Sequence, residues 1–172
     1  MMKKILLLSL IAGLFTGLNA SAQQDKSKRP SPPAKVSETI ASGAIISIDY
    51  SQPSLKGRTI GKDIVTYGEV WRAGANEATV FETNKEVKIE GKTLPAGKYS
   101  FYAIPGAESW TLIFNKTWQQ WGTVYKQDTD ALRVDVKPAK AASATEKMMF
   151  AIAKDGQVSL MWGDTAINFQ VN

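Results

Sequence analysis

The sequence contains no cysteine and no histidine. Without cysteine the protein forms no disulfide bond and carries no lipid anchor on an N-terminal cysteine. Without histidine, the Ser-His-Asp and Cys-His catalytic arrangements are excluded. Zinc, copper and haem sites that depend on imidazole or thiolate ligands are excluded for the same reason. We therefore expect no metal and no cofactor.

Long apolar runs are also scarce, and the one at residues 5–18 is too short for a spanning helix, which needs about 20 residues. Lys3 and Lys4 precede this run, and Ala-Ser-Ala follows it at residues 20–22. These are the three parts of a secretory signal peptide. We predict cleavage after Ala22, export to the periplasm or the outside, and a soluble protein that is neither a lipoprotein nor membrane-spanning.

The excess of positive charge does not belong to the domain that follows. Residues 23–35 contain three of the seven prolines and no aliphatic side chain larger than alanine, which predicts a flexible basic tether. Six of the 21 cationic and one of the 16 acidic residues lie before residue 36, so residues 36–172 carry 15 charges of each sign. A nucleic-acid-binding domain should present a basic face, so we expect no nucleic-acid partner.

Period-two alternation of apolar residues dominates residues 36–172, which predicts half-buried strands in a single domain. The alternating segments are residues 44–50, 87–89, 98–104, 110–115, 158–162 and 167–171. We predict an all-β fold of about eight or nine antiparallel strands, a β-sandwich of the jelly-roll or immunoglobulin-like type. A closed β-barrel is the alternative.

Further predictions concern single segments. Residues 146–153 follow the capping-box pattern of Ser143 and Glu146, but the run is short, so a buried strand is favoured over a helix. Gly163-Asp164 predicts the turn of a C-terminal hairpin. Residues 63–70 and 128–133 could each form a short helix in a loop.

The segment at residues 67–79, YGEVWRAGANEAT, is the densest in chemistry-bearing side chains. Arg72 can bind a carboxylate through two N–H groups, while Asn76 offers donor and acceptor and Glu77 accepts. With Trp71 stacking, these residues are candidates for holding a polar ligand. The alternative is structural: Trp71 fills the core and Arg72 pairs with Glu77 or Asp63.

A second aromatic group follows in residues 114–130. Trp118 and Trp121, with two glutamines between them, could form a stacking platform for sugar rings. The alternative is a loop whose tryptophans attach it to the core, because large aromatic side chains usually bury most of their surface.

Five motifs together resemble the exported bacterial family known as domain of unknown function 2911, DUF2911. They are Tyr50-Ser-Gln-Pro53, Lys56-Gly57-Arg58, residues 67–79, Leu94-Pro-Ala-Gly-Lys-Tyr99 and residues 110–115. The resemblance extends over residues 36–172 and implies threonine at position 73, where this chain has Ala73. It implies no assigned activity, so the catalytic residues stay unknown.

The leading hypothesis is a non-catalytic binding module for a polar ligand such as a glycan or an envelope component. One alternative is a carboxylate-dependent hydrolase without histidine or cysteine, using an acid pair with the separation that glycosidases require. Its candidate acids are Asp63, Glu69, Glu77 and Asp130. The other alternative is a structural or interaction protein of the envelope.

Overall fold

The computed structural model describes residues 25–172, so the predicted signal peptide lies outside the described residues. Within this range the only helical pieces are two single 3-10 turns, η1 (Lys26–Lys28) and η2 (Gln127–Thr129). The strands are β1 (Pro33–Thr39), β2 (Ile45–Ser51), β3 (Thr79–Thr83), β4 (Val87–Ile89), β5 (Lys92–Leu94), β6 (Gly97–Ile104), β7 (Trp110–Asn115), β8 (Asp130–Val136), β9 (Pro138–Ile152) and β10 (Gln157–Gln170). No helix in residues 25–172 has the length and apolar character needed to cross a membrane.

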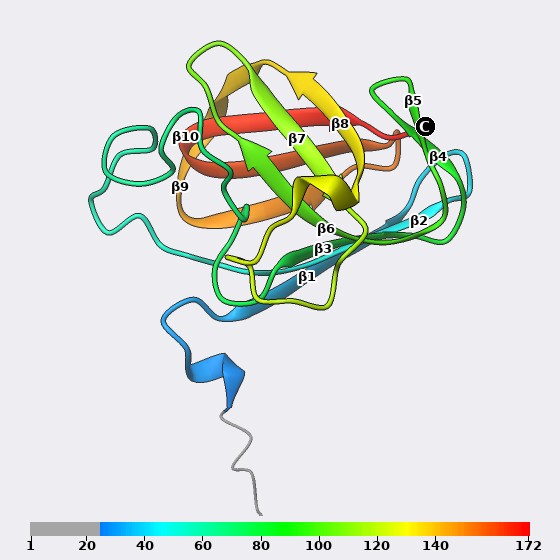
Figure 1. The fold of residues 1–172 in the computed structure, drawn as a ribbon. Coiled ribbons are helices and arrows are strands. Elements are labelled where there is room, and N and C mark those ends of the chain that lie inside the picture. The colour runs from blue at the N-terminus through cyan, green and yellow to red at the C-terminus, as the bar shows by residue number, and fades with distance from the viewer. Residues whose placement is uncertain (1–24) are drawn as a thin grey trace, which may run out of the picture.

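Six strands form one antiparallel sheet in the order β1-β2-β3-β6-β7-β8. The two longest strands, β9 and β10, pair with each other, and their hairpin lies across this sheet as a second layer (Figure 1). β4 and β5 form a short ribbon that a bridge between Ile89 and Val171 joins to the C-terminal residues. The sheets do not close on themselves. The predicted all-β sandwich is therefore confirmed, and the barrel alternative is wrong.

Alternate residues of both layers form the core, as the period-two pattern predicts. In β2, Ile46 and Ile48 are 0% and 1% exposed, whereas Ile45 on the opposite face is 46% exposed. Between the layers, Phe101 of β6 stacks on Phe169 of β10 with ring centroids 5.9 Å apart. Such ring pairs add to the free energy gained by burying apolar area. They hold the sheet and the hairpin together.

The chain after β2 is attached to the second layer. The amide of Leu55 donates to the carbonyl of Glu146, and the amide of Met148 donates to the carbonyl of Pro53, each at 2.9 Å. These bonds fix the start of the long loop that follows β2. Residues 146–152 are part of β9, so the strand predicted there is confirmed.

The structure corrects the predicted C-terminal hairpin. The chain turns at residues 154–156, and β10 continues through Gly163-Asp164 as one strand paired with β9. Register shifts on both sides of Gly163, whose φ is 61°, mark a bulge. The bulge changes the alternation, so that Trp162 and Ile167 both face the core. The prediction is wrong because glycine with a change of alternation is typical of a turn as well as of a bulge.

Other boundaries also differ from the sequence-based ones. β1 begins at Pro33, inside the segment predicted to be a tether, and Lys35 pairs with Asp49 of β2 at 2.9 Å. Residues 63–70 form a loop, and residues 128–133 contain the end of η2 and the start of β8. The short helix predicted at residues 63–70 is wrong. The one predicted at residues 128–133 is limited to its first two residues, which belong to η2, because the chain from Asp130 onward pairs with β7 as β8.

Gly156 closes the β9–β10 hairpin at a φ of 92°, and a Cβ there would lie 1.9 Å from the carbonyl oxygen of Val171. We expect Gly156→Ala to lower the free energy of unfolding by on the order of 3 kcal/mol, from backbone strain together with the clash. Chemical denaturation followed by tryptophan fluorescence measures this.

Gly91→Ala is the matched control, because Gly91 has a φ of 79° and nothing lies within 4 Å of an added Cβ. Its cost should be about 1 kcal/mol, from the left-handed backbone alone. Equal losses for the two variants would contradict the steric role of Gly156.

Candidate functional site

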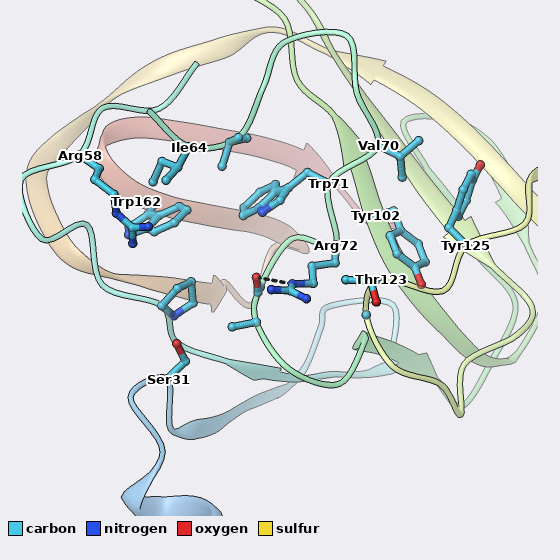
Figure 2. Close-up of a pocket in the computed structure, with 15 residues that line it drawn as sticks. Ser31, Arg58, Ile64, Val70, Trp71, Arg72, Tyr102, Thr123, Tyr125 and Trp162 are labelled. Carbon is cyan, nitrogen blue, oxygen red and sulfur yellow. Dashed lines mark hydrogen bonds between the residues drawn. The ribbon is translucent and has the colours of Figure 1, made fainter. Parts of the chain in front are cut away.

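Two long loops, residues 52–78 and 116–129, surround an open cavity of about 640 Å³ (Figure 2). Strand residues complete it, with Tyr102 from β6 and Trp162 from β10. The lining residues are Ser31, Pro53, Arg58, Ile64, Val65, Val70, Trp71, Arg72, Gly74, Ala75, Tyr102, Gly122, Thr123, Tyr125 and Trp162. Of the six candidates taken from the sequence, only Trp71 and Arg72 are among them.

Stacked indoles form one wall of this cavity. Trp71 and Trp162 lie nearly parallel, with ring centroids 5.9 Å apart and an interplanar angle of 10°. Trp71 also meets Trp110 edge-on at 6.0 Å. Two backbone hydrogen bonds with Ala103 of β6, at 2.7 and 2.9 Å, fix the position of Trp71. Trp71 therefore packs against the core, as the structural alternative predicts, and also lines the cavity.

Arg72 extends into the cavity from the next position (Figure 2). Its Nε donates to the carbonyl of Gly74 at 3.3 Å, and a Cβ at Gly122 would lie 2.6 Å from its Cδ, so the neighbouring loop packs on its stem. Within residues 25–172 no carboxylate forms an ion pair with it. The predicted pairing of Arg72 with Glu77 or Asp63 does not form.

Arg58 is a lining residue that we did not select from the sequence. Its Nε donates to the carbonyl of Leu55 and its Nη2 to that of Ser54, both at 2.9 Å. Within the described range it too has no carboxylate in ion-pair contact. The signal that could have identified it is its place in the Lys56-Gly57-Arg58 motif.

Asn76 and Glu77 do not converge with Arg72 on the cavity. The side-chain amide of Asn76 donates to the carbonyl of Ser31 at 3.0 Å. The Glu77 carboxylate accepts two hydrogen bonds from Arg29, at 3.0 and 2.8 Å, and pairs with Lys26 at 3.0 Å. Both side chains therefore hold the segment before β1 against the domain.

The pKa of the Glu77 carboxyl is lower than its ordinary value. Burial raises the pKa of its carboxyl, but hydrogen bonds from its own amide and from Lys26 and Arg29 outweigh burial and lower the pKa to about 2. This carboxyl is therefore ionised at neutral pH, and its charge is used by two cations of the N-terminal segment.

The two loop tryptophans also lie outside the cavity lining. Trp118 is half-buried, and the ammonium of Lys98 lies 4.9 Å from its ring centroid. Trp121 is 48% exposed, and its backbone bridges to that of Glu77. No ring contact between the two is found among the described residues, so a shared sugar-stacking platform stays a prediction.

Two tyrosines form the opposite wall, and their hydroxyl groups are engaged by the protein. The hydroxyl of Tyr102 donates to the carbonyl of Val124 at 2.7 Å. That of Tyr125 donates to Asp130 at 2.7 Å and accepts from Arg133 at 2.5 Å. Burial, with the hydrogen bond to Asp130, raises the pKa of Tyr125 to about 12, so this phenol is protonated at neutral pH.

The four acids considered for an acid pair do not line the cavity. Asp63 accepts from the amide of Thr59 at 2.8 Å, and Asp130 pairs with Arg133 at 2.8 Å. Glu77 is engaged as described, and Glu69 is exposed. Residues 25–172 also contain no cluster of three or more histidine, cysteine or acidic side chains that could hold a metal ion.

A comparison with known families supports the resemblance seen in the sequence. The family described as "Protein of unknown function (DUF2911)" matches residues 31–171. No curated protein and no solved structure matches the chain.

The ion pairs of Glu77 predict a measurable titration. In the native protein the Glu77 carboxyl should titrate near 2, and in Arg29→Gln its pKa should rise toward the ordinary value of 4.5. Because the folded pKa is depressed, the stabilisation is present above 4.5 and is lost as the pH falls toward 2. Carbon-13 NMR of the carboxyl measures both values.

Lys28→Gln is the control, since Lys28 contacts Asp25 at 3.8 Å and not Glu77. It should leave the Glu77 titration unchanged. A native Glu77 that titrates at 4.5 would contradict the ion pairs with Lys26 and Arg29.

Proposed function

This chain belongs to the DUF2911 family, and we propose that its domain is a non-catalytic binding module whose polar ligand, such as a glycan, occupies the cavity beside Trp71. The observation that carries this proposal is the pairing of a stacked indole wall with a guanidinium group that has no carboxylate partner among residues 25–172. Indole surface suits the apolar face of a sugar ring, and arginine suits its polar groups.

The size of the cavity supports the same function. Its volume of about 640 Å³ falls within the range of known ligand sites. It is lined by indole and aliphatic surface together with a few polar groups, and this composition is common in sites for small molecules. A short saccharide fits this description.

The backbone around the cavity is also strained. Lys56, Val65, Ala73 and Asn76 have positive φ angles of 50°, 57°, 45° and 60° in the loop that carries Trp71 and Arg72. Val65 is the least expected of these, because β-branched side chains rarely adopt this conformation. Strained residues cluster at ligand sites, where surrounding contacts hold the chain in one shape. The loop is thus a preformed support for a ligand.

The lining groups favour binding over catalysis. They include no carboxylate, and the two tyrosine hydroxyls are occupied by hydrogen bonds with the protein. The lining offers no carboxylate or imidazole as a general base, so nothing in it would activate the hydroxyl of Ser31 or Thr123 as a nucleophile. Because the predicted signal peptide would export the protein, we propose that the ligand lies outside the inner membrane.

Blocking the mouth of the cavity tests the proposal. Val70 is exposed and lines the cavity, so Val70→Trp should fill the entrance and abolish binding to a panel of soluble oligosaccharides on a glycan array. Val124→Trp is the matched control, because Val124 is equally an exposed valine of a loop but does not line the cavity. Failure of the native protein to bind any member of the panel, or equal binding by both variants, would overturn the proposal.

A further inference from the structure

We infer that the ligand of this cavity is an acidic saccharide, and that Arg58 and Arg72 bind its anionic group, a carboxylate or a phosphate. This inference rests on the proposed function and specifies the ligand class. It follows from the charge of the lining, which contains two arginines and no aspartate or glutamate.

The other two arginines of the chain show what these side chains do where no ligand site is involved. Arg29 pairs with Glu77 and Arg133 pairs with Asp130, each at 2.8 Å. The two arginines of the cavity form no such pair within residues 25–172. The arginines without an ion pair are thus the two that line the cavity. We therefore expect a ligand to supply their anionic partner.

Both guanidinium groups are held in place without being neutralised. Arg58 donates to the carbonyls of Ser54 and Leu55, and Arg72 donates through Nε to the carbonyl of Gly74. These acceptors are uncharged main-chain groups. Within the described range, Nη1 of Arg58 and both terminal nitrogens of Arg72 have no protein acceptor. Their N–H groups can therefore bind an oxyanion, because the planar guanidinium group presents a fork of N–H donors that matches a carboxylate or a phosphate.

The acids nearest in sequence pair with neither arginine. Glu69, three positions before Arg72, is exposed and does not line the cavity. Asp63, on the loop of Arg58, accepts the amide of Thr59 at 2.8 Å. Glu77, five positions after Arg72, is bound by Arg29 and Lys26. Arg58 is exposed and stays hydrated, but Arg72 is partly buried, and a partly buried cation without a counter-ion is unfavourable because its desolvation is not compensated. An anionic ligand would supply that compensation here.

The indole wall narrows the anion to one that carries a ring. Trp71 and Trp162 line the same cavity as the two arginines (Figure 2). An anion alone would contact the guanidinium groups but not the part of the Trp71 ring that stays accessible in the cavity beside the buried Trp162. A sugar ring with an acidic substituent uses both, and its acid can be the carboxylate of a uronic acid or a phosphate ester.

Indole N–H signals in NMR provide five built-in reporters, one for each tryptophan. The native protein is titrated in phosphate-free buffer with glucuronate, glucose 6-phosphate, inorganic phosphate and glucose. Glucuronate or glucose 6-phosphate should shift the signals of Trp71 and Trp162 and leave that of Trp118 unchanged. The two acidic probes distinguish a carboxylate from a phosphate site. Inorganic phosphate alone should bind more weakly, because it lacks the ring.

Single substitutions test the two arginines. Arg58→Gln and Arg72→Gln should each raise the Kd of the acidic probe at least about tenfold, through loss of a charge-assisted hydrogen bond. Arg72→Lys, which keeps the charge but not the fork, should bind with intermediate affinity. Lys88→Gln makes the same change of charge on β4, outside the cavity lining, and should leave the Kd unchanged.

The outcomes separate this inference from the proposed function. Shifts of Trp71 and Trp162 by glucose as large as those by the acidic probes would keep the binding function and overturn the acidic ligand. Unchanged affinity in both glutamine variants would do the same. Absence of any shift with all four probes, together with an unresponsive oligosaccharide panel, would overturn both. Circular dichroism of each variant verifies that it is folded.

Discussion

The stack of Trp71 on Trp162 is the contact on which both the end of the sandwich and the cavity depend. Trp162 belongs to β10, whereas Trp71 belongs to the loop between β2 and β3, so the pair joins the loop to the second layer. The edge contact with Trp110 of β7 joins both to the first layer. The cavity wall is thus continuous with the close-packed core, and it shares the rigidity of the core.

The strands whose apolar residues alternate clearly could be predicted, because that pattern is local. Alternation along β2 and β7 identifies the buried face from neighbouring residues alone, and the structure has those strands within one residue of the predicted bounds. The bulge at Gly163 could not be predicted in the same way. A bulge and a turn both break the alternation next to a glycine, and only the partner strand β9 decides between them.

The site was harder to predict, because its members meet through tertiary contacts. Residue chemistry in one segment identified Trp71 and Arg72 as site residues. The same reasoning also selected Glu77, because the sequence does not show that its side chain points away from the cavity. The loop turns through left-handed residues at Ala73 and Asn76, and these send neighbouring side chains in different directions. Arg58 belongs to a loop segment that hydrogen bonds attach to β9. Its motif marks it in the sequence, but only this tertiary contact places it in the cavity.

The positive charge of the cavity lining comes from the distribution of charged residues and not from the net charge of the domain. Residues 36–172 carry 15 charges of each sign and so have no net charge to attract a ligand. The N-terminal segment alters the charge beside the cavity, because Lys26 and Arg29 form ion pairs with Glu77, the acid that follows Arg72 in the same loop. Glu77 is thereby withdrawn as a partner for Arg72. The lining of the cavity is thus positive although the domain is neutral, because no acid lines it and Asp63, Glu77 and Asp130 are held in contacts elsewhere.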